Sequence, residues 1–173
     1  MSEQMQSATM TEREALARRF FEDVFSEGRL EVIDEITSDD FQAHDPQDRF
    51  TELRGPAASR AVVKLYRDAF PDLRFTIEDV VEQRDRVVVR WTATGTHQGE
   101  LLGLAPTGKS ATVSGITIWR MAGGRVVEAW TNWDTLGLMQ QIGAAPAPGG
   151  RAEKLGVRFQ RAAIAVERKV RSR

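Results

Sequence analysis

Hydrophobic residues recur at helical spacing in the first seventy residues of the chain. They lie three or four positions apart in three segments, at residues 11–26, 30–36 and 55–70, which is typical of amphipathic helices. Thr11 followed by Glu14 forms a capping box, so the first helix is predicted to begin there. A brief extended segment at residues 41–46 separates the second helix from the third, because a residue before proline is driven away from helical geometry.

The middle of the chain has a different pattern, in which apolar and polar residues alternate. Four such segments are rich in Val, Ile, Thr and Trp and predict strands at 74–83, 86–97, 111–121 and 125–134. Glycines at 123 and 124 predict a tight hairpin between the last two. A short helix is expected at 136–142. Helices followed by an antiparallel meander indicate an α+β fold, not an alternating α/β fold.

The last predicted strand carries the most distinctive set of side chains. Two-residue alternation places five residues on one face: Val126, Glu128, Trp130, Asn132 and Asp134. Asp134 stands at the end of the strand and directly before a helix. Two roles suit it equally: a reactive carboxylate beside an indole and an amide, or the N-cap of the following helix. The pattern leaves both open.

Composition narrows the class of protein. The chain has 173 residues, 41% hydrophobic and 28% charged, with a net charge of −1, which is typical of one soluble globular domain. It has no cysteine, which excludes disulfides, thiolate metal sites and a cysteine nucleophile. No apolar run approaches the roughly 20 residues of a membrane span, and no secretory signal pattern opens the chain. We therefore expect a cytoplasmic protein with a disordered N-terminus over residues 1–10.

The two ends of the chain differ in charge. Residues 151–173 carry eight Lys or Arg and two Glu, a net +6, which leaves −7 for the rest. A Pro- and Gly-rich linker at 147–150 precedes this segment. Its helical stripe consists of Leu155, Phe159, Ala162, Ala163, Val166 and Val170. We expect a basic amphipathic helix that packs on the domain or on a second subunit. Two alternatives are binding to an acidic partner or nucleic acid, and lying on a membrane surface. Because aromatic interleaving is sparse, nucleic acid is not expected.

Several short motifs then suggest a family. They are Ala43-His44-Asp45-Pro46, Phe70-Pro71-Asp72, Gly95-Thr96-His97-Gln98-Gly99, Pro106-Thr107-Gly108 and the stretch 125–134. In this order, over about residues 12–146, they resemble the SnoaL-like polyketide cyclase family of the nuclear-transport-factor-2-like superfamily. The resemblance implies a conical barrel over residues 11–146. A strongly curved antiparallel sheet would be wrapped by N-terminal helices around one pocket, with the segment 151–173 as an extra C-terminal helix.

The resemblance also implies a reaction. The cyclases that name the family close a ring by intramolecular aldol condensation, without metal or cofactor, and use an aspartate at the position matched by Asp134. That carboxylate would remove a proton next to a carbonyl and later return it. The family's pocket histidine is missing from strand 115–120, so Arg120 or Thr117 is the candidate replacement. We thus expect a cofactor-independent acid/base enzyme, most simply an aldol-type cyclase, acting on a polyketide-like or polycyclic molecule.

The predicted site contains further residues. We expect Asp134 and His44 to be catalytic, and five residues to bind substrate: Asn132, Trp130, Arg120, Trp119 and His97. His44 alternatively makes a local turn, and His97 alternatively bonds to backbone at a strand end. Asp45 is expected to face outward, because neighbours on an extended segment point to opposite sides. Two distant histidines do not make a zinc site, so no metal is expected.

Other functions remain open at this point. The domain is alternatively a non-catalytic module that binds a hydrophobic ligand, or an isomerase, hydrolase or hydroxylase on the same fold. An isomerase or hydrolase would need a second pocket carboxylate, for which Glu128 and Glu78 are the candidates. We expect a homodimer, because an open sheet leaves a face and edges to cover.

Overall fold

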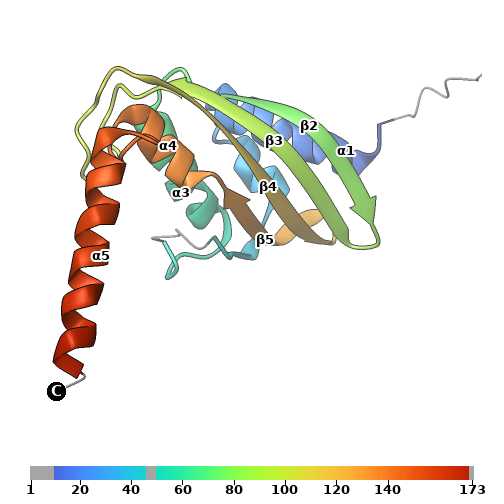
Figure 1. The fold of residues 1–173 in the computed structure, drawn as a ribbon. Helices are drawn as coiled ribbons and strands as arrows, with labels where there is room; N and C mark the ends of the chain where they lie inside the picture. The colour runs from blue at the N-terminus through green and yellow to red at the C-terminus, as the bar shows by residue number, and fades with distance from the viewer. Residues whose placement is uncertain (1–9, 46–49, 172–173) are drawn as a thin grey trace, which may run out of the picture.

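The computed structural model describes residues 10–45 and 50–171, and on the last helix the side chains up to residue 161 and at 164. The N-terminus predicted to be disordered covers residues 1–10, and of these only Met10 belongs to the described residues. Figure 1 shows the helices of the first half on one side of a single curved sheet, with the last helix projecting from the domain.

The N-terminal helix has two parts. α1 (Glu12–Arg18) begins where predicted, because the Thr11 hydroxyl accepts a hydrogen bond from the Glu14 N–H at 3.1 Å. It continues as a π-helical turn, η1 (Arg19–Ser26), and the chain then turns at Gly28, whose φ is +78°. The other helices are α2 (Val32–Ile36), α3 (Gly55–Ala69), α4 (Thr135–Ile142) and α5 (Arg151–Arg171).

The sheet has five strands in the order β1-β5-β4-β3-β2. These strands are β1 (Thr37–Ala43), β2 (Arg74–Gln83), β3 (Arg86–Thr96), β4 (Ser110–Ala122) and β5 (Arg125–Trp133). The last four form the predicted antiparallel meander, whereas β1 pairs with β5 in parallel. The extended segment expected at 41–46 begins earlier, at Thr37, because its backbone pairs with β5, a contact that local sequence does not reveal.

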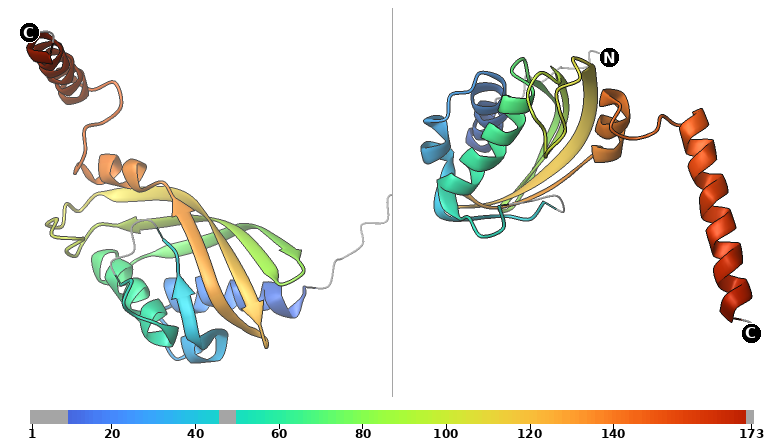
Figure 2. Two further views of the ribbon diagram at one scale, coloured as in Figure 1. Left: turned by 90° about the horizontal axis from the view of Figure 1, so that it is seen from below. Right: turned by 90° about the vertical axis from the view of Figure 1, so that its left-hand side faces the viewer.

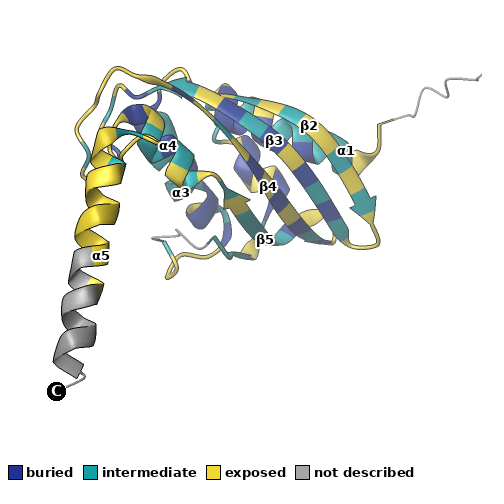
Figure 3. Cartoon of the chain, viewed as in Figure 1, coloured by how far each residue is buried: buried dark blue, intermediate teal, exposed yellow. Residues whose placement is uncertain are grey.

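The sheet curls around η1 and α3, so it has a concave face toward the helices and a convex face (Figure 2). Aromatic side chains join the two layers: Phe21 stacks on Trp119 at 5.9 Å between ring centroids, and Phe20 meets the same indole edge-on at 5.3 Å. The predicted α+β cone is confirmed as a curved sheet that does not close. Figure 3 shows buried residues concentrated where the sheet faces the helices.

α5 stands away from the domain in the views of Figures 1 and 2. Leu155 and Phe159 of its predicted stripe are 53% and 68% exposed, so this part of the stripe does not pack on its own domain. The side chains of the stripe at 162, 163, 166 and 170 lie outside the description. Over the described part of the chain, none of the helices combines the length and apolarity needed to cross a bilayer.

Candidate functional site

A cavity of about 160 Å³ opens between the concave face of the sheet and the helices. Its walls are mostly aromatic and aliphatic, with Phe21, Phe41, Tyr66, Trp91, Trp119 and Trp133 among them. Trp119, a predicted substrate-binding residue, therefore lines the cavity, and Trp133 and Trp130 lie on opposite faces of the sheet. An apolar concave pocket with few polar groups is the usual form of a small-molecule site.

Asp45 is the single carboxylate among the described residues that line this cavity. The expectation that it faces outward was wrong, and the cause is the parallel pairing of β1 with β5. Ala43 pairs with Ala129, and the His44 N–H continues the ladder to the Ala129 carbonyl at 2.8 Å. Both alanines line the cavity, so two-residue alternation turns His44 outward and Asp45 inward.

A β-bulge in β5 decides which of its side chains face the cavity. Arg120 pairs with Glu128 but Met121 pairs with Val126, so Val127 is an extra residue in the strand. A bulge of this kind reverses the alternation beyond it. The predicted single face from Val126 to Asp134 is therefore wrong. Val126 lines the cavity together with Ala129, Thr131 and Trp133, whereas Glu128, Trp130 and Asn132 belong to the convex face.

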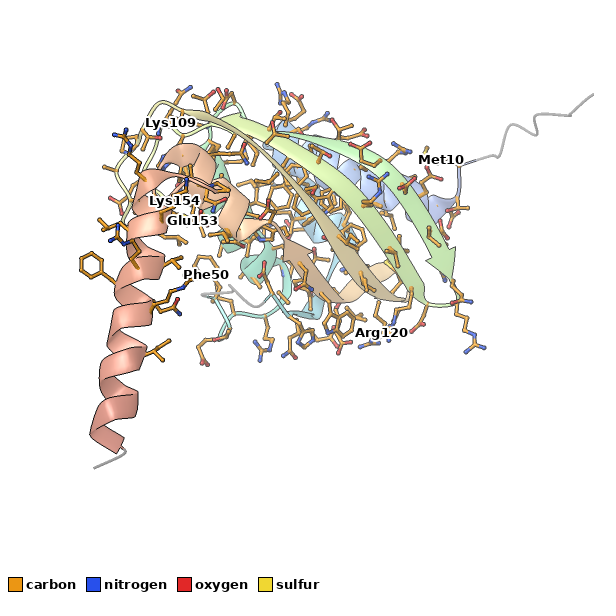
Figure 4. All side chains as sticks on the ribbon, viewed as in Figure 1. Met10, Phe50, Lys109, Arg120, Glu153 and Lys154 are labelled. Carbon is orange, nitrogen blue, oxygen red and sulfur yellow. The ribbon has the colours of Figure 1, made fainter. Side chains whose placement is uncertain are left out.

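The convex side holds four of the predicted site residues, and none of them lines the cavity. The His44 ring stacks on Trp130 at 4.9 Å with an interplanar angle of 13°, and Asn132 is exposed. Arg120, near the β4–β5 turn (Figure 4), donates from Nε to Glu128 Oε2 at 2.8 Å.

That charge-assisted bond raises the pKa of the Arg120 guanidinium and lowers the pKa of the Glu128 carboxyl. Glu78, the other predicted second carboxylate, is also exposed and accepts a hydrogen bond from the Thr92 hydroxyl at 2.8 Å. Neither Glu128 nor Glu78 is therefore available to the cavity as the second carboxylate of an isomerase or hydrolase.

Asp134 is the N-cap of α4, which is one of the two roles that the sequence left open for it. Its Oδ1 accepts the Gly137 N–H at 2.8 Å, and the residue is exposed and absent from the cavity lining. Gly143 ends the helix with a φ of +84°, as the C-terminal signal predicts. Of the two roles that the sequence left open, the geometry is that of a helix cap.

His97 is fully buried behind the cavity wall rather than in it. Its Nδ1 lies 3.2 Å from the Thr107 hydroxyl, its backbone N–H bonds to the Lys109 carbonyl, and its ring packs on Phe70 at 5.4 Å. The contacts match the structural alternative, in which this histidine organises the glycine-rich loop.

The Phe70-Pro71-Asp72 motif has a related structural task. Asp72 accepts hydrogen bonds from the Thr96 N–H at 2.7 Å and the Thr96 hydroxyl at 2.8 Å, and these bonds lower the pKa of its carboxyl. The motif thus ties the end of α3 to the end of β3. Within the described ranges, no three His, Asp or Glu side chains gather closely enough to hold a metal ion.

Sequence reasoning missed Asp45 and the inward-facing Thr131. For Thr131, the missing information was which alternate residues of β5 face the cavity. The bulge in β5 decides this, and a bulge has no reliable local signature in the sequence. Trp91, on the predicted strand 86–97, also lies in the cavity wall.

A curved open sheet around an apolar pocket is the cone architecture of nuclear-transport-factor-2-like proteins, and comparisons identify the branch. The model of the SnoaL-like polyketide cyclase family matches residues 15–142. A protein of Acidithiobacillus ferrooxidans, described as a candidate polyketide cyclase, is 33% identical; the match covers 82% of this chain and 99% of that one, with a TM-score of 0.71.

Two Streptomyces proteins are also similar. AclR of Streptomyces galilaeus, described as a candidate hydroxylase, is 25% identical with a TM-score of 0.70, and the match covers 92% of this chain and 98% of AclR. TsrD of Streptomyces laurentii is 26% identical with a TM-score of 0.71, over 82% and 100% of the two chains. No curated protein matches the chain. The chain belongs to the SnoaL-like polyketide cyclase family.

Proposed function

We propose that this protein is a cofactor-independent acid/base enzyme that forms an enolate from a polyketide-like or polycyclic ketone. The observation that carries the proposal is Asp45, a carboxylate in a cavity lined otherwise by apolar and hydroxyl side chains. A carboxylate held against a bound ketone can remove a proton from the carbon next to the carbonyl. The predicted base, Asp134, caps α4 instead, so the proposal assigns the proton transfer to Asp45.

The proposed reaction is an intramolecular aldol closure, in agreement with the family. Asp45 takes the α-proton, and the C–H electron pair enters the enolate. The enolate carbon then forms a bond to a second carbonyl carbon of the same molecule, whose oxygen takes the proton back from Asp45. Atoms and charge balance without any other reactant. An apolar, enclosed wall favours this chemistry because it excludes competing water.

Exchange of α-hydrogen for deuterium tests the proton transfer without requiring the natural substrate. The probes are aromatic β-diketones in D₂O, followed by proton NMR. Asp45→Asn should slow the catalysed exchange by about 10²- to 10⁴-fold, the usual contribution of a positioned base. The matched control is Asp134→Asn, which keeps a good N-cap and should leave the rate within about twofold.

The two alternatives give different results. Exchange that survives in Asp45→Asn but is lost in Asp134→Asn would contradict the assignment. Binding of the diketones without exchange in the unaltered protein would favour a non-catalytic module for hydrophobic ligands, the second candidate function, which the mostly apolar cavity wall supports.

We also propose that two copies pair through the convex face of the sheet. Ile116 and Ile118 are 46% and 38% exposed there, and burial of such side chains stabilises association. Ile118→Lys should therefore shift the protein from dimer to monomer in size-exclusion chromatography at micromolar concentration. Leu136→Lys, at an exposed position on α4, is the control and should leave the elution unchanged. A monomer peak for the unaltered protein would contradict the proposal.

A further inference from the structure

Three polar side chains on neighbouring strands form a hydrogen-bonded row in the cavity wall. The indole Nε1–H of Trp91 on β3 donates to the Thr117 hydroxyl on β4 at 3.0 Å. That hydroxyl lies 3.1 Å from the hydroxyl of Thr131 on β5. All three residues line the cavity, and Trp91 and Thr117 are 5% and 4% exposed. The row therefore runs across one wall of a mostly apolar pocket.

The row contains three donor hydrogens but makes only two hydrogen bonds. An indole N–H can only donate, and each threonine hydroxyl has a single hydrogen to give. Trp91 uses one acceptor site on Thr117, and the two hydroxyls share one bond, whichever of them donates. One hydroxyl hydrogen of the threonine pair is therefore left over. Within the described residues, neither hydroxyl has another hydrogen-bond partner, so this hydrogen is available to a molecule in the cavity.

Gly115 makes the row possible. A Cβ at this position would lie 2.4 Å from Cζ2 of Trp91 and 2.8 Å from Cβ of Trp133. Both distances are far below a normal contact, so any other residue would displace the indole. The absence of a side chain lets the Trp91 ring lie across β4 and reach Thr117. The geometry is thus held from two sides, by the hydrogen bond and by close packing against backbone.

Asp45 lines the same cavity as this row. It follows β1, which pairs with β5 as far as Ala43 and Ala129, and Thr131 lies two residues further along β5. A ligand can therefore lie against the carboxylate and the threonine pair at the same time, as a carbonyl group and its α-carbon require.

We propose that the Thr117–Thr131 pair donates the hydrogen bond that holds the enolate oxygen, with Trp91 as the residue that positions and polarises it. This inference rests on the proposed enolate chemistry of Asp45. As the α-proton moves to Asp45, the C–H electron pair shifts onto the carbonyl oxygen, which accepts the leftover hydroxyl hydrogen as a hydrogen bond. A preorganised neutral donor is suited to this task, because it stabilises a developing charge without adding a proton. Hydrogen bonds in a row strengthen one another.

The pair also restricts the substrate class. The acidic hydrogen must be on the carbon next to a ketone carbonyl, so that the carboxylate and the hydroxyl pair reach the hydrogen and the oxygen together. A 1,3-diketone or an aromatic ketone with an α-methylene fits this requirement. A compound without a carbonyl would leave the hydroxyl hydrogen without an acceptor, and that is costly once water is displaced.

Phenolate binding tests the pair separately from turnover. In Asp45→Asn, the neutral amide stands for the protonated carboxyl that exists after proton transfer. The probe is 4-nitrophenol, whose bound phenolate resembles an enolate and is followed by absorbance, and 4-nitroanisole is the uncharged isostere. Adding Thr117→Val/Thr131→Val should weaken phenolate binding about tenfold, since bonds to charged groups are the stronger ones, and change nitroanisole binding by less than about twofold. Thr131→Val alone should weaken phenolate binding less, because the Thr117 hydroxyl then still has its hydrogen to donate.

Thr37→Val is the matched control, because Thr37 is another cavity hydroxyl, 3.5 Å from that of Ser59. It should leave the phenolate affinity unchanged. Equal losses in Thr117→Val/Thr131→Val and Thr37→Val, equal losses for both probes, or no phenolate binding at all would overturn the inference. Deuterium exchange that survives in Asp45→Asn would overturn the assignment of Asp45 as the base. The phenolate titration would still test the Thr117–Thr131 pair separately.

Discussion

The concave and convex faces of the sheet are built from the same strands and differ completely in chemistry. On the concave face, indoles and hydroxyls surround a cavity with one carboxylate, Asp45, among the described lining residues. On the convex face, charges neutralise one another, as in the Arg120–Glu128 pair. Trp130 contacts the His44 ring there, and the Arg86 guanidinium carbon lies 5.4 Å from the centroid of the Trp130 ring. Reactivity therefore depends on which face a side chain reaches.

One extra residue sets this difference in β5. Without the bulge at Val127, simple alternation from Val126 would turn Glu128 and Trp130 toward the cavity and Thr131 outward. Glu128 would then be an unpaired charge in an apolar wall, which is costly. The bulge keeps the carboxylate paired with Arg120 and brings the Thr131 hydroxyl inside. A local irregularity therefore acts on both stability and the composition of the site.

The largest stability difference between the faces is expected at two adjacent residues of β4. Gly115→Ala forces a methyl group against Trp91 on the crowded concave side, where the Cβ would lie 2.4 Å from the indole. Overpacking of this kind costs about 1–3 kcal/mol. Ser114→Ala changes an exposed residue on the convex side and should alter the free energy of unfolding by less than about 0.5 kcal/mol.

Urea denaturation followed by tryptophan fluorescence measures both variants. Equal midpoints for Gly115→Ala and Ser114→Ala would show that the concave wall is not tightly packed at this point. The phenolate titration of Gly115→Ala sharpens the result, because a displaced Trp91 should also weaken the Thr117–Thr131 donor.

The smallest expected effect concerns the Arg120–Glu128 ion pair on the convex face, and it is detected in the pH dependence of stability. The hydrogen bond from Arg120 lowers the pKa of Glu128. A carboxyl with a lowered folded-state pKa contributes stability above its unfolded pKa of about 4.3, and that contribution is lost as pH falls through the folded value. Glu128→Gln removes the titrating group. Its stability should therefore fall less steeply than that of the unaltered protein between about pH 5 and pH 3.

Thermal unfolding across this pH range, at low salt, measures the slope. Parallel pH profiles for Glu128→Gln and the unaltered protein would mean that the pair is fully screened by solvent.

The sequence alone determined the elements and much of the local chemistry. Alternation predicted the four strands of the meander. Thr11 correctly predicted the start of the first helix, and Gly143 correctly predicted the end of α4. Motif order gave the cone fold and the family. Asp134 was recognised as a possible cap, and it caps α4. These features depend on neighbours within a few residues, so the order of residues is sufficient to predict them.

Only the tertiary structure decided which aspartate and which threonine enter the cavity. The inward turn of Asp45 follows from the parallel register of β1 on β5, and the inward turn of Thr131 follows from the bulge opposite β4. Both depend on pairing between strands, and β1 and β5 are distant in sequence. The side-chain period of a strand is two, so a shift of one residue moves every later side chain to the other face. That parity is fixed by strand pairing and core packing, which is the physical reason that the sequence left it open.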